Sequence, residues 1–369
     1  MAKHKVLLMT PSLNYGGEEL STINIARELM ARGHKVAYMS SGGPIEKFLR
    51  RYSIRFVKAN INGRGPVGIV RGAAEIYRFL KKEPASIIHA QTPWPALMSR
   101  FAVTLSKQKI PVIWHDRGIR RRNYPYMARL ANLFFDFVIT NSDDEKKLLL
   151  ACGLSPAKVR RIHNGLNIPD HEKKSSGIRL KLGIDPDAFL VGAIGRMVKE
   201  KGFDWLIKAA AELEAAGFGR KVNYLLVGDG PLKAKLQKMS FDMKLGKKIF
   251  FAGFTDDVSG IMKDLDVLAV PSEFEPFGNV VLEGMYAGVP VVASKVGGIK
   301  EIISDGQDGL LIEPRNPSAI AKAIQMLMSD KELKGKIAEG GRQKVISYFN
   351  IKRVVNEIED VYYKITRSI

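Results

Sequence analysis

Short apolar runs alternate with amphipathic segments along almost the whole chain, and this alternation constrains the fold more than any other feature. Runs typical of β-strands lie at residues 6–9, 36–39, 55–57, 86–89, 112–114, 137–140 and 159–162, and again at 190–194, 223–227, 249–251, 267–270, 289–293 and 310–312. The segments between them have helical periodicity. Such alternation requires right-handed crossovers between parallel strands, with helices on both faces of each sheet. The sequence therefore predicts an α/β fold with doubly wound sheets.

Two domains are expected, because 369 residues exceed what one hydrophobic core usually organises. The strand–helix alternation is interrupted at residues 169–177, which are polar and lack periodicity. This predicts a first domain at residues 1–168, a linker at 169–177, a second domain at 178–349 and a final helical segment at 350–369. Ligands bind doubly wound sheets at the carboxyl ends of the strands, so we expect a site there, in a cleft between the domains.

Composition excludes several classes of protein. The single cysteine, Cys152, excludes an intramolecular disulfide and a cysteine-built zinc site, and suits a reducing cytoplasm. The apolar run at the start is too short for a secretory signal, and no run approaches the roughly 18 apolar residues of a membrane-spanning helix. Of the net charge of +20, +16 falls in residues 1–170, which favours an anionic lipid or an anionic acceptor as partner. Nucleic acid is not expected, because aromatic residues are not interleaved with the basic ones.

The stretch from residue 270 to 303 combines features that point to a ligand site. Pro271 ends a buried run, and a loop leads through Glu275 to a helix that begins after Gly278. Glu283 follows about two helical turns beyond Glu275. Backbone N–H groups at a glycine-rich helix start attract anions, while carboxylates accept hydrogen bonds from a polyhydroxy ligand. The alternative interpretation is that the acids only complement the helix macrodipole.

This combination resembles the Glu-x7-Glu signature of the retaining nucleotide-sugar glycosyltransferases of family 4 (glycosyl transferases group 1), which have the GT-B fold. Glu275 and Glu283 occupy the two glutamate positions of the signature. The resemblance covers nearly the whole chain. It implies two Rossmann-like domains that face each other across a cleft, with the acceptor on the first domain and the nucleotide-sugar donor on the second. It also implies a C-terminal helix that crosses back to the first domain.

Other motifs at strand ends match the same family. Gly16 and Gly17 match its GGxE loop, near the donor diphosphate and the acceptor, and Arg196 and Lys201 match its diphosphate ligands. His115 matches a histidine that reaches the donor sugar. In isolation, a solvated basic loop would explain Arg196 and Lys201, and a lone histidine is more often structural. The donor-binding residues implied by the resemblance are Gly16, Gly17, Gly253, Phe254, Phe277, Gly278, Asn279, Val280 and Glu283, and the catalytic ones are Glu275, Arg196, Lys201 and His115.

The resemblance implies retaining transfer of a hexosyl group from a UDP- or GDP-linked sugar, with no enzymic nucleophile. No cofactor and no metal are expected. Asp264 and Asp266 have the spacing of a metal-binding DxD motif, but they directly precede a buried run and are better explained as a helix end. Two alternatives remain: a nucleotide-sugar epimerase of the same fold, and a non-catalytic protein that binds anions or nucleic acid, which the surplus charge favours.

Arg117, Arg120, Arg121 and Arg122 directly precede an apolar helical pattern that extends to residue 135. In one interpretation the apolar face packs on the sheet and the arginines are solvated. In the other, the segment rests on an anionic leaflet, where each basic residue contributes about 1 kcal/mol. Such docking would bring the first domain to a lipid-linked, lipopolysaccharide or other envelope glycan. The expected location is the cytoplasm of a bacterial-type cell, with peripheral attachment to the inner face of the plasma membrane.

Overall fold

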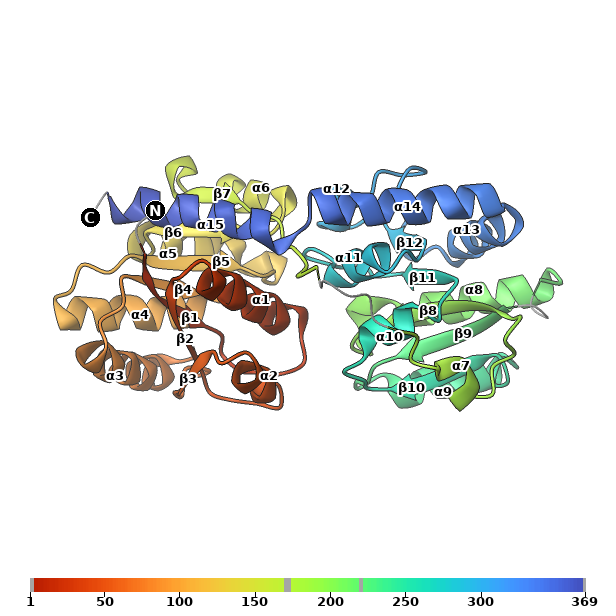
Figure 1. Cartoon of the computed structure of the whole chain (residues 1–369), viewed down its shortest axis with the longest axis horizontal. Helices are drawn as coiled ribbons and strands as arrows, with labels where there is room; N and C mark the ends of the chain where they lie inside the picture. The colour runs from red at the N-terminus through yellow and green to blue at the C-terminus, as the bar shows by residue number, and fades with distance from the viewer. Residues whose placement is uncertain (1–2, 169–173, 219–221, 368–369) are drawn as a thin grey trace. The chain divides into compact units, whose positions relative to one another are not determined.

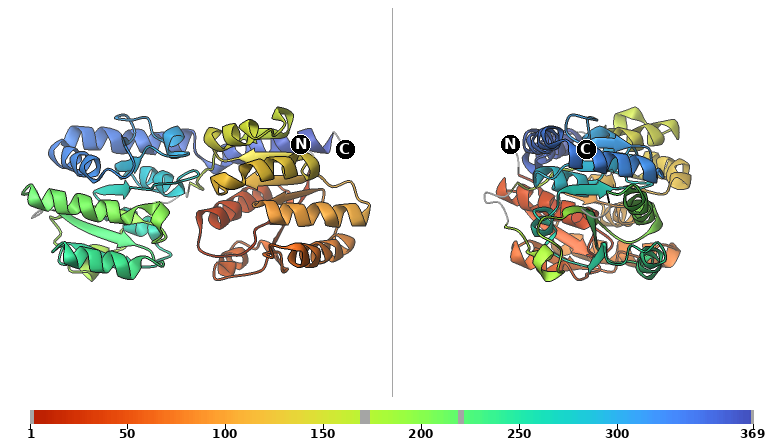
Figure 2. Two further views of the ribbon diagram at one scale, coloured as in Figure 1. Left: turned by 180° about the vertical axis from the view of Figure 1, so that it is seen from behind. Right: turned by 90° about the vertical axis from the view of Figure 1, so that its right-hand side faces the viewer.

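The computed structural model describes residues 3–168, 174–218 and 222–367, and the chain divides into two compact units. Unit 1 comprises residues 1–167 and 350–369, and unit 2 comprises residues 168–349. Each unit is a parallel sheet between helices (Figure 1). Figure 2 shows the same helical layers from two further directions. The predicted α/β class and the doubly wound sheets are confirmed.

The sheet of unit 1 has seven strands in the order β3-β2-β1-β4-β5-β6-β7, with every neighbouring pair parallel. The strands are β1 (Lys5–Met9), β2 (Lys35–Ser40), β3 (Arg55–Lys58), β4 (Ile87–Ala90), β5 (Val112–Asp116), β6 (Phe137–Thr140) and β7 (Val159–Arg161). The helices are α1 (Gly17–Ala31), α2 (Glu46–Arg51), α3 (Pro66–Lys82), α4 (Pro93–Ser106), α5 (Tyr124–Phe134), α6 (Asp143–Ala151) and α15 (Ile351–Thr366), with 3-10 turns η1 (Arg121–Asn123) and η2 (Pro156–Lys158).

The central strand β1 shows how unit 1 is packed. Side chains alternate between the two faces of a strand, and β1 is apolar on both. Leu7 and Met9 belong to a core beneath α3, α4 and α5, whereas Val6 and Leu8 belong to a second core beneath α1, α2 and α15. The run of apolar residues in β1 therefore fills two cores at once.

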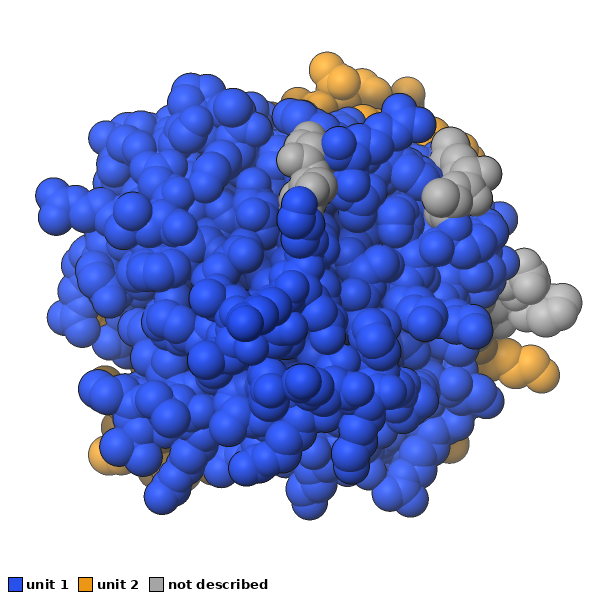
Figure 3. Space-filling model, turned by 90° about the vertical axis from the view of Figure 1, so that its left-hand side faces the viewer, with its two compact units in different colours: residues 1–167, 350–369 blue, residues 168–349 orange. Residues whose placement is uncertain are grey.

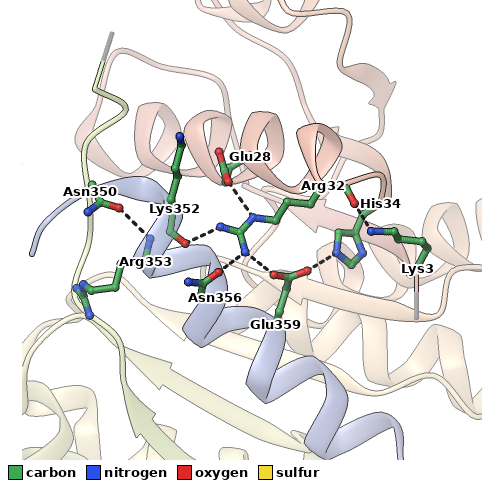
Figure 4. Close-up of polar contacts among 9 residues, drawn as sticks. All are labelled: Lys3, Glu28, Arg32, His34, Asn350, Lys352, Arg353, Asn356 and Glu359. Carbon is green, nitrogen blue, oxygen red and sulfur yellow. Dashed lines mark hydrogen bonds and ion pairs between the residues drawn. The ribbon is translucent and has the colours of Figure 1, made fainter. Parts of the chain in front are cut away.

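The last helix, α15, belongs to unit 1, as the family resemblance implied. Its apolar face, which includes Ile358 and Tyr362, is buried in the second core, and residues 350–367 have the colour of residues 3–167 in Figure 3. Polar contacts fix its outer side (Figure 4): Glu359 accepts hydrogen bonds from Arg32 (2.5 Å) and from Nε2 of His34 (2.7 Å). Because these contacts join α15 to α1 and β2, the end of the chain is an integral layer of unit 1.

The sheet of unit 2 has six strands in the order β10-β9-β8-β11-β12-β13, again all parallel. The strands are β8 (Phe189–Ile194), β9 (Val222–Val227), β10 (Ile249–Gly253), β11 (Val267–Val270), β12 (Val291–Ser294) and β13 (Leu310–Ile312). The helices are α7 (Ile178–Lys181), α8 (Phe203–Ala215), α9 (Lys233–Asp242), α10 (Val258–Met262), α11 (Asn279–Tyr286), α12 (Ile299–Ile302), α13 (Pro317–Ser329) and α14 (Lys331–Ser347), with the 3-10 turn η3 (Lys199–Lys201).

The structure differs from the sequence-based expectation in two details. Strand β12 begins at Val291 instead of residue 289, because the N–H of Val289 is bonded to the carbonyl of Gly284 and Pro290 has no N–H to donate. The expected linker at residues 169–177 lies partly outside the described residues. Of its described part, Ser175 and Ser176 donate hydrogen bonds to the Asp264 carboxylate (2.6 and 2.7 Å) and so belong to unit 2.

Candidate functional site

Loops from four strands pack against one another at the carboxyl edge of the unit 2 sheet. Glycines permit this approach: Gly202 has a φ of +65°, and a Cβ there would lie 2.0 Å from the carbonyl oxygen of Pro271. Gly297, with a φ of +46°, would place a Cβ 2.0 Å from the carbonyl oxygen of Glu275. The loops that meet in this way are residues 195–202 after β8, 228–231 after β9, 271–278 after β11 and 295–298 after β12.

Two of the predicted catalytic residues are in contact within this group of loops. The ammonium of Lys201 lies 2.5 Å from Oε2 of Glu275, and the Glu275 side chain is buried, at 8% exposure for the residue. Ser272 also approaches the same carboxylate oxygen, at 3.4 Å. Arg196, in the same loop as Lys201, is exposed, and its guanidinium has no carboxylate partner within the described part of the chain. One cation is thus paired with a carboxylate, and a second is available to an anion.

Helix α11 begins beside this pair. Its N-cap is Gly278, which has a φ of +110° and no side chain to cap the helix; Phe277 precedes this cap, and Asn279 and Val280 are the first two residues of the helix. Glu283, one further turn along, is half-buried, and burial raises the pKa of its carboxyl to about 7. Among the described residues this carboxyl has no hydrogen-bond or ion-pair partner. It can therefore both donate and accept hydrogen bonds near neutral pH.

A second clamp on the same loop was not predicted from the sequence. Glu273 accepts a hydrogen bond from the Trp205 indole (3.0 Å) and pairs with Arg315 (2.7 Å), while its backbone N–H binds the carbonyl of Glu200 (2.8 Å). The hydrogen bonds from Trp205 and Arg315, together with the charge of Arg315, hold the pKa of Glu273 below its usual range despite partial burial. Lys208 stacks over the Trp205 ring at 3.7 Å. The signal in the sequence was a second acid two residues before Glu275, to which no function had been assigned.

Gly253 and Phe254 lie at the outer end of the same edge. Gly253 ends β10, the edge strand, with a φ of +71°, and its carbonyl accepts a hydrogen bond from the N–H of Gly228 (2.8 Å). The Phe254 side chain is 49% exposed. An exposed aromatic ring at this position suits a flat ligand group.

In unit 1, Gly16 and Gly17 stand where α1 begins. Gly16 is the N-cap, and a Cβ on it would lie 2.4 Å from Oε2 of Glu19, so the carboxylate of Glu19 folds back over this loop. The next side chain, Glu18, is half-buried, and burial and the charge of Glu19 raise its pKa to about 8. The glycines thus allow two carboxylates to lie close to the loop backbone.

His115 lies near the carboxyl end of β5, and its side chain is enclosed by polar partners. The residue is 1% exposed, with Nδ1 3.0 Å from Nε2 of His89 and Nε2 3.0 Å from Oδ1 of Asn141. Nδ1 of His89 in turn lies 2.8 Å from the hydroxyl of Tyr362 on α15. Both ring nitrogens of His115 are thus bonded inside unit 1, and contact between this residue and the donor sugar stays a prediction. Burial lowers the pKa of both histidines, that of His89 to about 3, so both are neutral.

Arg117 is not the exposed surface residue that was predicted, because its guanidinium is bonded within unit 1. Its guanidinium donates to Oε1 of Gln91 (2.8 Å), to Oδ1 of Asn141 (3.1 Å) and to Oδ1 of Asn164. Burial lowers the pKa of Arg117 to about 10, although Glu18 and other neighbouring carboxyls raise it. Two of its amide partners, Gln91 and Asn141, each directly follow a buried strand, and that position is the sequence signal that could have identified them.

The three arginines that follow are exposed, as the prediction for them required. The apolar residues after them divide between two faces of α5. Tyr124 and Met127 are buried in the core under the sheet, whereas Tyr126 is 54% and Leu133 is 75% exposed. The buried residues thus fit the interpretation in which the helix packs on the sheet, and the exposed residues fit the interpretation in which the segment rests on a leaflet. The three exposed arginines are Arg120, Arg121 and Arg122; Arg121 lies 3.6 Å from Asp144.

Within residues 3–168, 174–218 and 222–367, no group of three or more histidine, cysteine or acidic side chains is arranged to hold a metal ion. Asp266 pairs with Arg179 (2.8 Å) and Lys334 (2.7 Å), and Asp264 binds the two serines of the expected linker, so the DxD-like pair is structural. In the same ranges, no helix has the length and apolar character needed to cross a membrane.

Two family models match successive parts of the chain. The model described as Glycosyltransferase Family 4 matches residues 15–169, and the model described as Glycosyl transferases group 1 matches residues 176–344. The first falls in unit 1 apart from its last two residues, and the second falls in unit 2.

Individual relatives and solved structures are similar to parts or to nearly the whole of the chain. The chain is 32% identical over 190 residues to the lipopolysaccharide core biosynthesis glycosyltransferase LpsE of Rhizobium meliloti, a match that spans 52% of this chain and 53% of LpsE, about half the length of that relative. It is 24% identical over 370 residues to N-acetyl-alpha-D-glucosaminyl L-malate synthase of Bacillus anthracis, covering 96% of this chain and 95% of that protein. The structure of Anabaena HepE in complex with UDP and glucose superposes with a TM-score of 0.86 and 24% identity over 97% of this chain and 99% of HepE.

Proposed function

This chain belongs to the GT-B glycosyltransferases of family 4, and from that premise we propose that it transfers a hexosyl group from a nucleoside diphosphate sugar to a glycan acceptor, with retention of configuration. The observation that carries the proposal is the arrangement at the carboxyl edge of unit 2. There Lys201, paired with Glu275, lies in the same loop as the unpaired cation Arg196, beside the uncapped start of α11.

The contact between Lys201 and Glu275 suggests how the donor is received. A diphosphate carries more negative charge than one carboxylate, and Arg196 and the start of α11 add to its attraction. The diphosphate would therefore displace Glu275 from Lys201, which frees the carboxylate to accept hydrogen bonds from sugar hydroxyls. Glu283, with its pKa near 7, would bind the ribose hydroxyls. As the bond to the sugar breaks, negative charge grows on the leaving diphosphate beside two fixed cations, and this lowers the barrier without a metal.

The donor and the acceptor are proposed by analogy with relatives. HepE has been solved with UDP and glucose, so a UDP-linked hexose is the first donor to test. LpsE is named for lipopolysaccharide core biosynthesis, so the proposed acceptor is an envelope glycan. The exposed residues Arg120, Arg121, Arg122, Tyr126 and Leu133 are a suitable surface for an anionic leaflet that carries such an acceptor.

The test begins with a thermal-shift screen of UDP, GDP, ADP and their sugars, because a ligand that binds only the folded chain raises the melting temperature. Radiolabelled nucleotide sugars that bind are then incubated with the protein and with candidate glycans, and hydrolysis, epimerisation and transfer are scored separately. The anomeric configuration of the product, from NMR, tests retention. Epimerisation without transfer would favour the epimerase alternative, and no binding of any nucleotide would contradict the proposal.

A further inference from the structure

One polar cluster in unit 1 has more carboxyls than cations. It consists of Glu18, Gln91, Asp116, Arg117 and Glu145, and we call it the Arg117 cluster. Its residues come from the start of α1, the ends of β4 and β5, and the first turn of α6, so they meet at the carboxyl edge of the sheet. The carboxyls that act on the charge of Arg117 are those of Glu18, Glu145 and Asp116. One guanidinium thus faces three carboxyls.

Two of these carboxyls have a structural partner. Glu145 accepts a hydrogen bond from the N–H of Asn141 (3.0 Å) and completes the capping of α6 with Ser142. Asp116 accepts hydrogen bonds from the N–H of Gly118 (3.1 Å) and from the hydroxyl of Tyr124. Glu18 is different. Among the described residues its carboxyl has no hydrogen-bond or ion-pair partner, and it is half-exposed, whereas Asp116 and Glu145 are buried.

An independent observation points to a ligand at this cluster. Gln91 is wholly buried, and Oε1 of its amide is held 2.8 Å from Nε of Arg117, which turns the amide into the cluster. Nevertheless Nε2 of Gln91 has no partner in the described structure, and neither has Oδ2 of the wholly buried Asp116. Buried polar atoms are nearly always paired in folded proteins. A donor and an acceptor left unpaired beside the same guanidinium are the groups that a sugar hydroxyl satisfies, since a hydroxyl both donates and accepts.

We propose that Glu18 determines acceptor specificity by binding a primary amino group on the acceptor sugar. The inference rests on the proposed function, because it assigns the Arg117 cluster to the acceptor. An ammonium group would bring the second cation that the cluster lacks and would form a charge-assisted hydrogen bond with Glu18. A phosphate or carboxylate would add negative charge where the carboxyls already outnumber the guanidinium, and so would not favour ionisation of Glu18.

The protonation state of Glu18 gives the inference a second readout. Burial, the charge of Glu19 and that of Asp116 raise the pKa of Glu18 to about 8, while Arg117 lowers it. At pH 7 the free protein therefore holds this carboxyl mostly protonated. A bound ammonium favours the ionised form, so binding of an amine should release a proton, and binding of a neutral sugar should release none.

The test is isothermal titration calorimetry of the full-length protein with two probes that differ at one carbon, methyl α-D-glucosaminide and methyl α-D-glucopyranoside. We expect the amine to bind about tenfold to a hundredfold more tightly, as one hydrogen bond between charged groups allows. Titration in two buffers of different ionisation enthalpy should show proton release for the amine alone. Glu18→Gln should lose the preference, Glu18→Asp should retain part of it, and Glu212→Gln, which removes an exposed carboxylate of α8, should leave it unchanged.

Equal binding of the two probes, or no detectable binding of the amine at tens of millimolar, would overturn the inference, as would equal losses in Glu18→Gln and Glu212→Gln. The outcome is separable from the proposed function, because UDP binding to unit 2 is measured on the same samples by thermal shift. A protein that binds UDP and transfers sugar but does not prefer the amine would retain the proposed function and lose this inference. A melting temperature of Glu18→Gln close to that of the wild type shows that the variant is folded.

Discussion

At the carboxyl edge of unit 2, the carboxylates of the loop before α11 each have a cation of their own: Glu275 pairs with Lys201, and Glu273 pairs with Arg315. At the same edge of unit 1, the charge of Arg117 is influenced by three carboxyls, and two neutral histidines, His89 and His115, are buried in the same unit. The first arrangement can exchange a carboxylate for a ligand anion at little cost. The second keeps its surplus charge low by protonation, so its stability and binding depend on pH.

The largest effect on turnover is expected when the charged residues at the carboxyl edge of unit 2 are replaced. Arg196→Ala and Lys201→Ala should each lower kcat by at least about a hundredfold, because both cations would face charge that grows as the diphosphate leaves. Glu275→Ala should also lose turnover. Steady-state kinetics with the donor identified by thermal shift measures these effects. Lys199→Ala, an exposed lysine of the same loop, is the matched control and should remain close to wild type.

If instead the Arg196, Lys201 and Glu275 variants kept kcat near the wild-type value, the edge of unit 2 would not be the catalytic one. The ion pairs at this edge would then only hold the loops together, and the two edges would not differ in function.

The next effect concerns the outer surface of unit 1. Replacing Arg120, Arg121 and Arg122 together with Ser should weaken binding to anionic vesicles by about 3 kcal/mol at most, since each basic residue near a leaflet contributes about 1 kcal/mol. Flotation with liposomes of rising anionic lipid content measures the partition, which should fall with salt. A matched control replaces Lys235, Lys238 and Lys247, three basic residues of unit 2, with Ser. Equal binding of the wild type to neutral vesicles would rule out an electrostatic surface.

A smaller effect is expected in the interior of unit 1, where the buried His89 makes the free energy of unfolding depend on pH. The folded pKa of His89 is about 3 and the unfolded value about 6.5, so between these values the unfolded chain binds a proton that the folded chain excludes. The contribution of His89 to the free energy of unfolding is therefore fully present above pH 6.5. It falls as the pH is lowered toward 3, by at most about 1.4 kcal/mol per pH unit. Asp116, whose folded pKa is raised to about 7, acts in the opposite direction.

Urea unfolding at pH 7 and pH 5 measures this dependence. His89→Gln should lose less stability between the two pH values than the wild type, although it is less stable at pH 7 because it loses hydrogen bonds in the core. His163→Gln is the control. An identical pH dependence in His89→Gln and wild type would show that the buried histidine does not resist protonation.

Removal of metal ions is expected to have no effect on transfer activity. Transfer activity should be unchanged by EDTA, because Arg196, Lys201 and the start of α11 are proposed to supply the positive field that a metal provides in other transferases. Loss of activity with EDTA and its return with Mg²⁺ or Mn²⁺ would contradict this part of the proposal. It would also remove the distinction between unit 2 and a metal-dependent site.

The sequence predicted the fold well because the relevant signal is local. Each apolar run from residue 6 to residue 312 forms a strand with ends displaced by at most two residues, and the later start of β12 follows from Pro290. The loops of unit 2 were also predicted from local motifs, and Lys201 and Glu275 do lie together. The internal contacts of His115 and Arg117 were not predicted, because they depend on partners far away in the sequence, Asn141, Asn164 and, through His89, Tyr362. No local pattern shows which way a side chain turns at the end of a strand.

The placement of α15 has a consequence for how the protein is made. The apolar residues of α15 fill the core of the unit to which residues 1–167 belong, yet they are synthesised after the whole of unit 2. Residues 168–349 can complete their core first, while the apolar face beneath α15 stays uncovered on the earlier part of the chain. Domains tend to fold in the order of synthesis, and exposed apolar surface promotes aggregation. Translation of this chain therefore reverses the usual order, so that the unit begun first is finished last and depends longest on protection by chaperones.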